Sequence, residues 1–313
     1  MPLDPESLAL LQQLAQSGAQ PFHRMTPETA REFLAGLRPA YGEGPAMRQV
    51  ENVTLGDEDQ AFQLRLLIPE GAVRGVIVHC HGGGWVTMSV DDFDTFGRLL
   101  ASKTNCAVVL VDYRLAPEHP YPAALEDCWD ALLWTEKERV RITGNEDAPL
   151  IISGDSAGGN LAAVIAQRSV RLKGPQLSLQ VLVYPVTQSK LDGPTYLNPE
   201  YQLLLSREDM AWFWDHYQPD KTLRSQPECS PLSAADFSGL PPAVVVTAEY
   251  DVLRDEGEAY AQAMRKAGVA VTERCFSSQM HVFFTMVNVL SASAEGIDFV
   301  SGQINARLSG ISD

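Results

Sequence analysis

A glycine-flanked serine stands between a short apolar run and a helical pattern, over residues 150–166. Residues 150–153 are the apolar run, 154–160 read Gly-Asp-Ser-Ala-Gly-Gly-Asn, and 161–166 have helical spacing. This order predicts a strand, a sharp turn and a helix, in which Gly-x-Ser-x-Gly presents the Ser156 hydroxyl at the carboxyl edge of a sheet. The pattern alone occurs by chance in about one chain in ten of this size, so its surroundings must decide.

Apolar runs and helical patterns alternate through most of the chain. We expect strands at residues 62–68, 75–80, 107–112, 150–154, 179–184, 243–248 and 271–276, and helices at 93–102, 123–137, 159–171 and 256–267. Continuous Val, Ile and Leu runs are typical of strands that are buried on both faces. The alternation predicts an α/β fold with a mostly parallel central sheet flanked by helices, formed by residues 46–187 and 241–313.

Two segments interrupt the alternation. Residues 1–45 contain two short helical patterns, each with an N-cap followed by proline, at Asp4 and Thr26. Residues 188–240 are rich in proline and turn residues and enclose a helix from Ser206, where Asp209 completes a capping box. Ligands bind beyond the strand ends of α/β sheets. We therefore expect residues 188–240 to form an inserted cap over the strand ends, with an ordinary surface helix as the alternative.

Composition excludes several classes of partner. The net charge is −16 over 313 residues, which disfavours nucleic acid and anionic membrane surfaces. No apolar run is long enough to span a bilayer, so no stable membrane insertion is expected. Five scattered cysteines show neither metal nor redox spacing and indicate a reducing compartment, with the cytoplasm as the expected location.

A serine nucleophile needs a base and an acid, which follow an elbow of this kind in the order serine, acid, histidine. Only His216 and His281 lie downstream, and His281 follows the last expected strand while His216 lies in the 188–240 segment. Asp251, directly after another strand, is the expected acid, and Glu249 is its rival. The acid would orient the imidazole and stabilise its protonated form.

A glycine run after the strand at 75–80 can bind an oxyanion through backbone N–H groups. Gly82 and Gly83 are the expected donors, Gly84 is a further candidate, and the Ala157 N–H at the helix start completes the site. No Lys-Ser/Thr pair follows the glycines, so a phosphate loop is excluded. His79 and His81 share one side of a strand but lack a third ligand at metal spacing, and we expect no metal.

Together these motifs resemble the hormone-sensitive-lipase family of α/β-hydrolase carboxylesterases, in its Gly-Asp-Ser-Ala-Gly branch. The resemblance covers most of the chain and rests on residues 81–85, 112–124, 154–160 and 251–257 and on His281, in this order. It implies Ser156, Asp251 and His281 as the triad, an N-terminal cap joined by an inserted segment, and hydrolysis of short- to medium-chain acyl esters without cofactor or metal. Homodimers are common in the family.

The chain departs from the family pattern near the histidine and after the glycine run. Members usually have glycine where this chain has Ser278 and Val282, and a valine does not readily adopt positive φ, so we expect a different turn there. The expected pocket wall consists of Trp85, Met88, Asp155, Trp212 and Phe213, with core packing as the alternative for the aromatic residues.

The sequence therefore predicts a serine carboxylesterase acting on a small-molecule ester through an acyl-enzyme. An amidase or lactonase with the same triad is the runner-up, because only the pocket separates these activities. A non-catalytic ligand receptor on the same fold is the alternative from another class.

Overall fold

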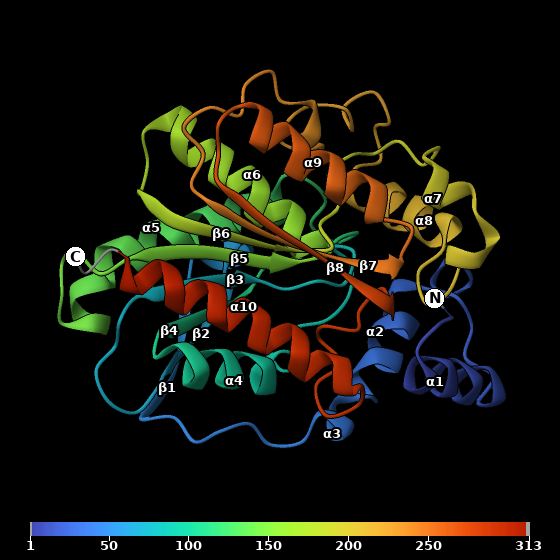
Figure 1. Cartoon of the computed structure of the whole chain (residues 1–313), viewed down its shortest axis with the longest axis horizontal. Coiled ribbons are helices and arrows are strands. Elements are labelled where there is room, and N and C mark those ends of the chain that lie inside the picture. Colours follow the sequence, from blue (N-terminus) through green and yellow to red (C-terminus); the bar gives the residue numbers. More distant parts are fainter. Residues whose placement is uncertain (1, 311–313) are drawn as a thin grey trace.

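The computed structural model describes residues 2–310, and an eight-stranded sheet runs through their centre (Figure 1). Across the sheet, the strands are β1 (Gln49–Leu55), β2 (Phe62–Ile68), β4 (Ala107–Asp112), β3 (Val76–Cys80), β5 (Leu150–Asp155), β6 (Leu177–Val183), β7 (Ala243–Tyr250) and β8 (Val271–Met280). Only the pairs β1–β2 and β2–β4 within this sheet are antiparallel. The predicted mostly parallel α/β sheet is confirmed.

Two strands differ from the sequence-based expectation. The strand β1 was not expected, because it lies at the sheet edge and its side chains are exposed or half-buried, several of them polar. The strand β8 continues past residue 276 to Met280. This extension brings the chain directly to His281 at the carboxyl end of the sheet.

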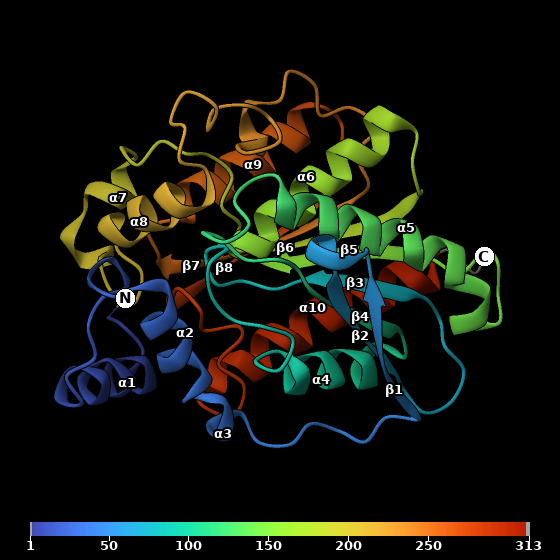
Figure 2. The same cartoon turned by 180° about the vertical axis from the view of Figure 1, so that it is seen from behind.

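Helices cover both faces of the sheet. α4 (Asp94–Thr104) and α10 (Ser291–Ser309) cover one face, and α5 (Ala123–Thr143), α6 (Ala157–Leu172) and α9 (Arg254–Lys266) cover the other (Figures 1 and 2). Each face packs its own cluster of buried apolar side chains against the sheet. α10 was not among the expected helices, since it is rich in serine and glycine, which have low helix propensity.

The remaining helices gather beyond the carboxyl ends of the parallel strands (Figures 1 and 2), apart from η2 (Glu58–Gln60) and η4 (Pro231–Ser233), which packs against α6 and α9. Residues 1–45 contribute α1 (Pro5–Gln16), η1 (Phe22–Arg24), α2 (Pro27–Ala35) and α3 (Arg38–Tyr41). Residues 188–240 contribute α7 (Pro194–Leu197), η3 (Pro199–Tyr201), α8 (Arg207–Tyr217) and η4 (Pro231–Ser233). The N-caps at Asp4 and Thr26 and the Ser206 capping box are confirmed. Within residues 2–310 no helix has the length and apolarity to cross a bilayer.

Candidate active site

Ser156 occupies a sharp turn between β5 and α6. Its φ of 55° lies in the left-handed region, a strained position for a residue with a side chain. A Cβ at Gly154 would collide with the Gly158 carbonyl, and one at Gly158 would collide with the Cys80 carbonyl. The Ser156 N–H donates to the Val183 carbonyl at 2.9 Å. The two glycines thus permit the tight turn, which the neighbouring strand β6 holds in place.

The structure brings Ser156, His281 and Asp251 into one hydrogen-bonded row. The His281 Nε2 lies 3.0 Å from the Ser156 Oγ, and the His281 Nδ1 lies 2.7 Å from the Asp251 Oδ2. An ionised carboxylate only accepts, so Nδ1 carries the proton and Nε2 presents its lone pair to the serine hydroxyl. The Leu253 N–H donates to the other Asp251 oxygen at 2.9 Å. All three side chains are buried.

The two rival residues lie elsewhere. Glu249 accepts the Ser278 N–H at 2.7 Å, so it holds the end of β8, just before His281, rather than the imidazole. His216 lies on α8, where its ring packs edge-on against Trp212 at 4.5 Å between centroids. Neither residue takes part in the row of Ser156, His281 and Asp251.

The glycine run after β3 faces Ser156, but its first N–H is already used. The Gly82 N–H donates to the Asp155 Oδ1 at 2.9 Å, which corrects the expectation that Gly82 is an oxyanion donor. The Gly83 and Gly84 N–H groups, and that of Ala157 at the start of α6, make no hydrogen bond to other described residues. A Cβ at Gly84 would collide with the Phe213 ring, so only glycine fits there. Three donors remain beside the serine.

Buried rings pack behind this glycine run. The His81 Nδ1 donates to the Gly82 carbonyl at 2.7 Å, and the Tyr113 ring stacks on His81 at 4.2 Å. Burial lowers the pKa of His81, so its ring is neutral. The His79 Nδ1 lies 3.1 Å from the Ser153 Oγ. No metal-type cluster of His, Cys, Asp or Glu occurs among the described residues, and these histidines support the backbone of the loop.

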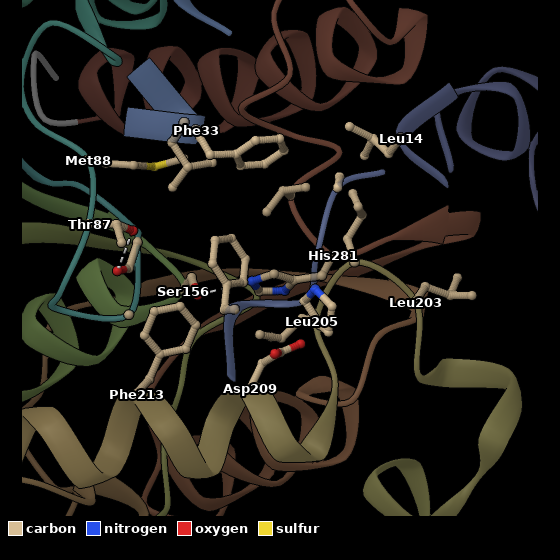
Figure 3. A pocket seen from close by; sticks show the side chains of 18 of the residues that line it. Leu14, Phe33, Thr87, Met88, Ser156, Leu203, Leu205, Asp209, Phe213 and His281 are labelled. Atoms are coloured by element: carbon tan, nitrogen blue, oxygen red, sulfur yellow. Dashed lines mark hydrogen bonds between the residues drawn. The ribbon is translucent and has the colours of Figure 1, made fainter. Parts of the chain in front are cut away.

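A largely apolar cavity of about 310 Å³ opens over Ser156 and His281. Figure 3 shows Met88 and Phe33 on one side of the pair and Leu14 and Leu203 on the other. The walls come from both segments beyond the strand ends and from the glycine and histidine loops. They include Leu11, Leu14, Phe22, Phe33, Leu34, Met88, Leu203, Leu204, Leu205, Phe213, Val282 and Met286.

The expected pocket wall needs two corrections. Met88, Asp155 and Phe213 line the cavity, but Trp85 and Trp212 do not. The Trp85 ring is fully buried and stacks on Tyr217 at 4.2 Å, while Trp212 packs edge-on against Phe213 at 5.0 Å. Both indoles turn away from the cavity into the packing around α8.

The contribution of α1 and of residues 203–205 to the cavity wall was not predicted from the sequence. The apolar stripe of Leu11 and Leu14 was the available signal for α1. Residues 203–205 lie in an irregular stretch with no periodic pattern.

Val282 also departs from expectation. Its φ is 67°, so the valine adopts the left-handed conformation that we expected it to avoid. Three hydrogen bonds to its carbonyl hold the turn: those from the Thr285 and Met286 N–H groups, at 3.1 and 3.3 Å, and that from the Thr285 hydroxyl.

The helix α1 is tied to the loop that carries His281. The Asp4 N–H donates to the Ser278 carbonyl at 2.9 Å, and the fully buried Ser7 hydroxyl donates to the Gln279 side chain at 3.4 Å. At the other end of the loop, the Ser291 N–H donates to the Glu6 carboxylate at 2.7 Å. The beginning of α1 therefore contacts the end of β8 and the start of α10, on either side of the loop that carries His281.

A family described as having the alpha/beta hydrolase fold matches residues 77–285, two thirds of the chain. The chain belongs to the α/β-hydrolase family. Among relatives of this hydrolase, carboxylesterase NlhH of Mycobacterium tuberculosis is 39% identical, over 70% of each chain. Ethyl acetate hydrolase of Pseudomonas putida is 32% identical, over 98% of this chain and all of the relative.

Solved structures give the same result. An ester hydrolase from the metagenome of Lake Arreo, complexed with a derivative of bipyridine phosphonate, superimposes with a TM-score of 0.91 at 32% identity. The match covers 98% of this chain and 99% of the other. The resemblance to the hormone-sensitive-lipase family is confirmed, and this α/β hydrolase is an enzyme of the carboxylic ester hydrolase class.

Proposed function

We propose that Ser156, His281 and Asp251 are the catalytic triad of a carboxylesterase for short- to medium-chain acyl esters. The observation that carries the proposal is the continuous row from the Ser156 Oγ through both His281 nitrogens to Asp251, with distances of 3.0 and 2.7 Å. The row lies at the floor of an apolar cavity, where an ester carbonyl can approach the serine.

In the first half-reaction, the Ser156 Oγ bonds to the ester carbonyl carbon as His281 Nε2 takes the hydroxyl proton. The N–H groups of Gly83, Gly84 and Ala157 stabilise the oxyanion that forms. Breakage of the carbon–oxygen bond releases the alcohol, which leaves with the proton from His281. Water then repeats these steps on the acyl-enzyme and releases the carboxylic acid, restoring Ser156.

The cavity supports the substrate class. Its walls are mostly Leu, Phe and Met side chains, and each methylene that a substrate buries there contributes about 0.8 kcal/mol, or roughly fourfold in kcat/KM. Residues 1–45 and 188–240 both supply walls. We infer that they act together as the cap over a core of residues 46–187 and 241–313.

The test is a series of p-nitrophenyl esters of increasing acyl length, with a matched p-nitroanilide. We expect kcat/KM to rise with chain length until the cavity is full, the anilide to be much slower, and Ser156→Ala to lose at least about 10⁴-fold in kcat. An anilide faster than its ester indicates an amidase instead. Unchanged ester turnover in Ser156→Ala, or no labelling of the enzyme by a fluorophosphonate, overturns the proposal.

Location and assembly stay predictions. The odd number of dispersed cysteines, four of them buried thiols, supports a reducing, cytoplasmic setting. The net charge of −16 supports small-molecule rather than nucleic-acid partners. Sedimentation equilibrium tests the homodimer by giving the mass in solution.

A further inference from the structure

Several non-glycine residues with positive φ lie close to Ser156 and His281 in the chain or in space. Ten non-glycine residues of the described chain have positive φ, and six of them belong to the active-site segments: Trp85, Met88, Ser156, Tyr184, Ser278 and Val282. Two of the others, Asn105 and Lys173, end helices, where this conformation is common. Backbone strain concentrated at a binding site points to a role for the side chains held there.

Val282 is the most unusual of the six. It is the one β-branched residue with positive φ within residues 2–310, and such residues avoid this region for steric reasons. Three of the hydrogen bonds that hold its turn use the Val282 carbonyl, and the fourth runs from the Phe283 N–H to the Met280 carbonyl at 3.3 Å. None involves the Val282 side chain, so a glycine would make the same bonds. The turn itself therefore does not require a valine.

The valine side chain instead lies at the cavity wall. It is half-buried, lines the cavity, and directly follows His281, whose Nε2 lies 3.0 Å from the Ser156 Oγ. The leaving oxygen of an ester must come within hydrogen-bond reach of this nitrogen to receive its proton. The alcohol half of the substrate consequently lies on the histidine side, next to Val282.

We propose that Val282 is a specificity-determining residue, which among alkyl esters favours unbranched alcohol groups over groups branched at the carbon attached to the leaving oxygen. The two γ-methyl groups stand where a branch on the carbon attached to the leaving oxygen would extend. Among alkyl esters, those of primary alcohols are then preferred, and the apolar cavity of about 310 Å³ is left for the acyl chain. This inference rests on the proposed function of Ser156 and His281.

The experiment compares ethyl butanoate with isopropyl butanoate by titrating the released acid. The kcat/KM ratio of isopropyl to ethyl ester is expected to rise at least tenfold in Val282→Gly and by a smaller factor in Val282→Ala. Val282→Ile is expected to lower the ratio. The ratio of ethyl hexanoate to ethyl butanoate should change less than twofold, because the acyl half lies away from residue 282.

Asn288→Gly is the matched control. Asn288 also has positive φ, at 59°, in the same segment, but it is exposed and does not line the cavity. Its substitution should leave the isopropyl-to-ethyl ratio within twofold of the parent. An equal change in Asn288→Gly and Val282→Gly would show that backbone relief, and not cavity space, alters selectivity, which overturns the proposal.

The remaining outcomes separate this inference from the function on which it rests. If the parent enzyme hydrolyses none of these esters, the proposed function fails. If it hydrolyses them and neither Val282→Gly nor Val282→Ala changes the alcohol ratio, or only the acyl ratio changes, the assignment of Val282 fails alone. If Val282→Gly does not fold, the other two variants still test the assignment. The isopropyl-to-ethyl ratio of kcat/KM is expected to rise in Val282→Ala and to fall in Val282→Ile.

Discussion

Asp155 reaches from the end of β5 to the backbone of the glycine run, where its Oδ1 accepts the Gly82 N–H at 2.9 Å. The carboxylate is buried, and a Cβ at Gly82 would run into it. Residue 155 and residue 82 therefore set the distance between the serine turn and the loop that carries Gly83 and Gly84. Asp155 is a positioning residue for the oxyanion donors.

At this residue, we expect Asp155→Ala to lower kcat roughly 10- to 100-fold with little change in KM, because the loop loses its anchor and its donors shift. Asp155→Asn keeps an oxygen that accepts the Gly82 N–H and should retain most of kcat. Steady-state kinetics on one p-nitrophenyl ester gives both constants. Equal losses in the two variants, or a loss confined to KM, would contradict this role.

Single residues also show what the sequence predicted and what it did not. Ser156, Asp251 and His281 could be placed together because each comes after an expected strand, and parallel strands end at one edge of the sheet. The observed strands β5, β7 and β8 end directly before these three residues. The engagement of the Gly82 N–H could not be predicted, since it depends on a contact between residues 73 positions apart. The inward turn of Trp85 likewise depends on the distant Tyr217.

At the scale of elements, the buried carboxylate of Asp209 links η1 to α8 at the cavity wall, beside the Phe22 and Phe213 rings, whose centroids lie 5.3 Å apart. The Asp209 Oδ1 accepts the His23 N–H at 2.9 Å and lies 2.8 Å from the His23 Nδ1. The Asp209 Oδ2 accepts the Ser206 N–H and hydroxyl at 3.0 and 2.7 Å. The capping box that begins α8 thus also holds the N-terminal segment over the cavity.

We expect His23→Ala to lower the free energy of unfolding by about 1–2 kcal/mol, because a buried carboxylate loses a partner. It should also speed proteolysis between α1 and α2, where η1 would be released from α8. Urea unfolding and limited proteolysis followed by mass spectrometry measure the two effects. Arg24→Ala, in the same turn but exposed, is the control, and matching behaviour of the two variants would contradict the role of His23.

Elements differ in how far local sequence specifies them. The helix starts at Asp4, Thr26 and Ser206 were predicted because a capping side chain lies within three residues of the N–H that it accepts. β1 forms only through its pairing with β2, and its exposed, polar side chains carry no strong alternation. Tertiary pairing, which a short window of sequence does not contain, determines such an edge strand.

At the scale of the whole molecule, Glu256 joins the α9 side of the core to the 188–240 segment. Its Oε1 accepts the Thr187 N–H at 2.7 Å, and its Oε2 lies 3.1 Å from the Tyr196 hydroxyl. Complete burial raises the pKa of Glu256 to about 8, against the opposing effect of these hydrogen bonds. The folded protein therefore keeps a proton that the unfolded chain releases above its ordinary pKa of 4.5.

Because the folded pKa is raised, the contribution of Glu256 to stability is full below pH 4.5 and is lost as the pH rises to about 8. The loss amounts to roughly 3–5 kcal/mol in the free energy of unfolding. We expect Glu256→Gln, which resembles the protonated side chain, to remove this decline. Urea unfolding at pH 5 and pH 8.5 measures it in both proteins.

Glu208→Gln, which changes an exposed carboxylate on α8, is the control and should keep the parent's decline. If Glu256→Gln loses stability in parallel with the parent between the two pH values, Glu256 is not the group responsible. In the comparison between variants, the contributions of the other carboxylates to the pH dependence of the free energy of unfolding cancel.

The hydrogen bonds between α1 and the residues beside His281 couple the position of this helix over the cavity to the position of the imidazole. Leu11 and Leu14 of α1 close the cavity, while Asp4 and Ser7 at the beginning of the same helix bind Ser278 and Gln279. We expect that any displacement of α1 from the cavity would also disturb these bonds and with them the position of His281, which directly follows β8. The enzyme is thus expected to have His281 aligned for catalysis only when α1 covers the cavity.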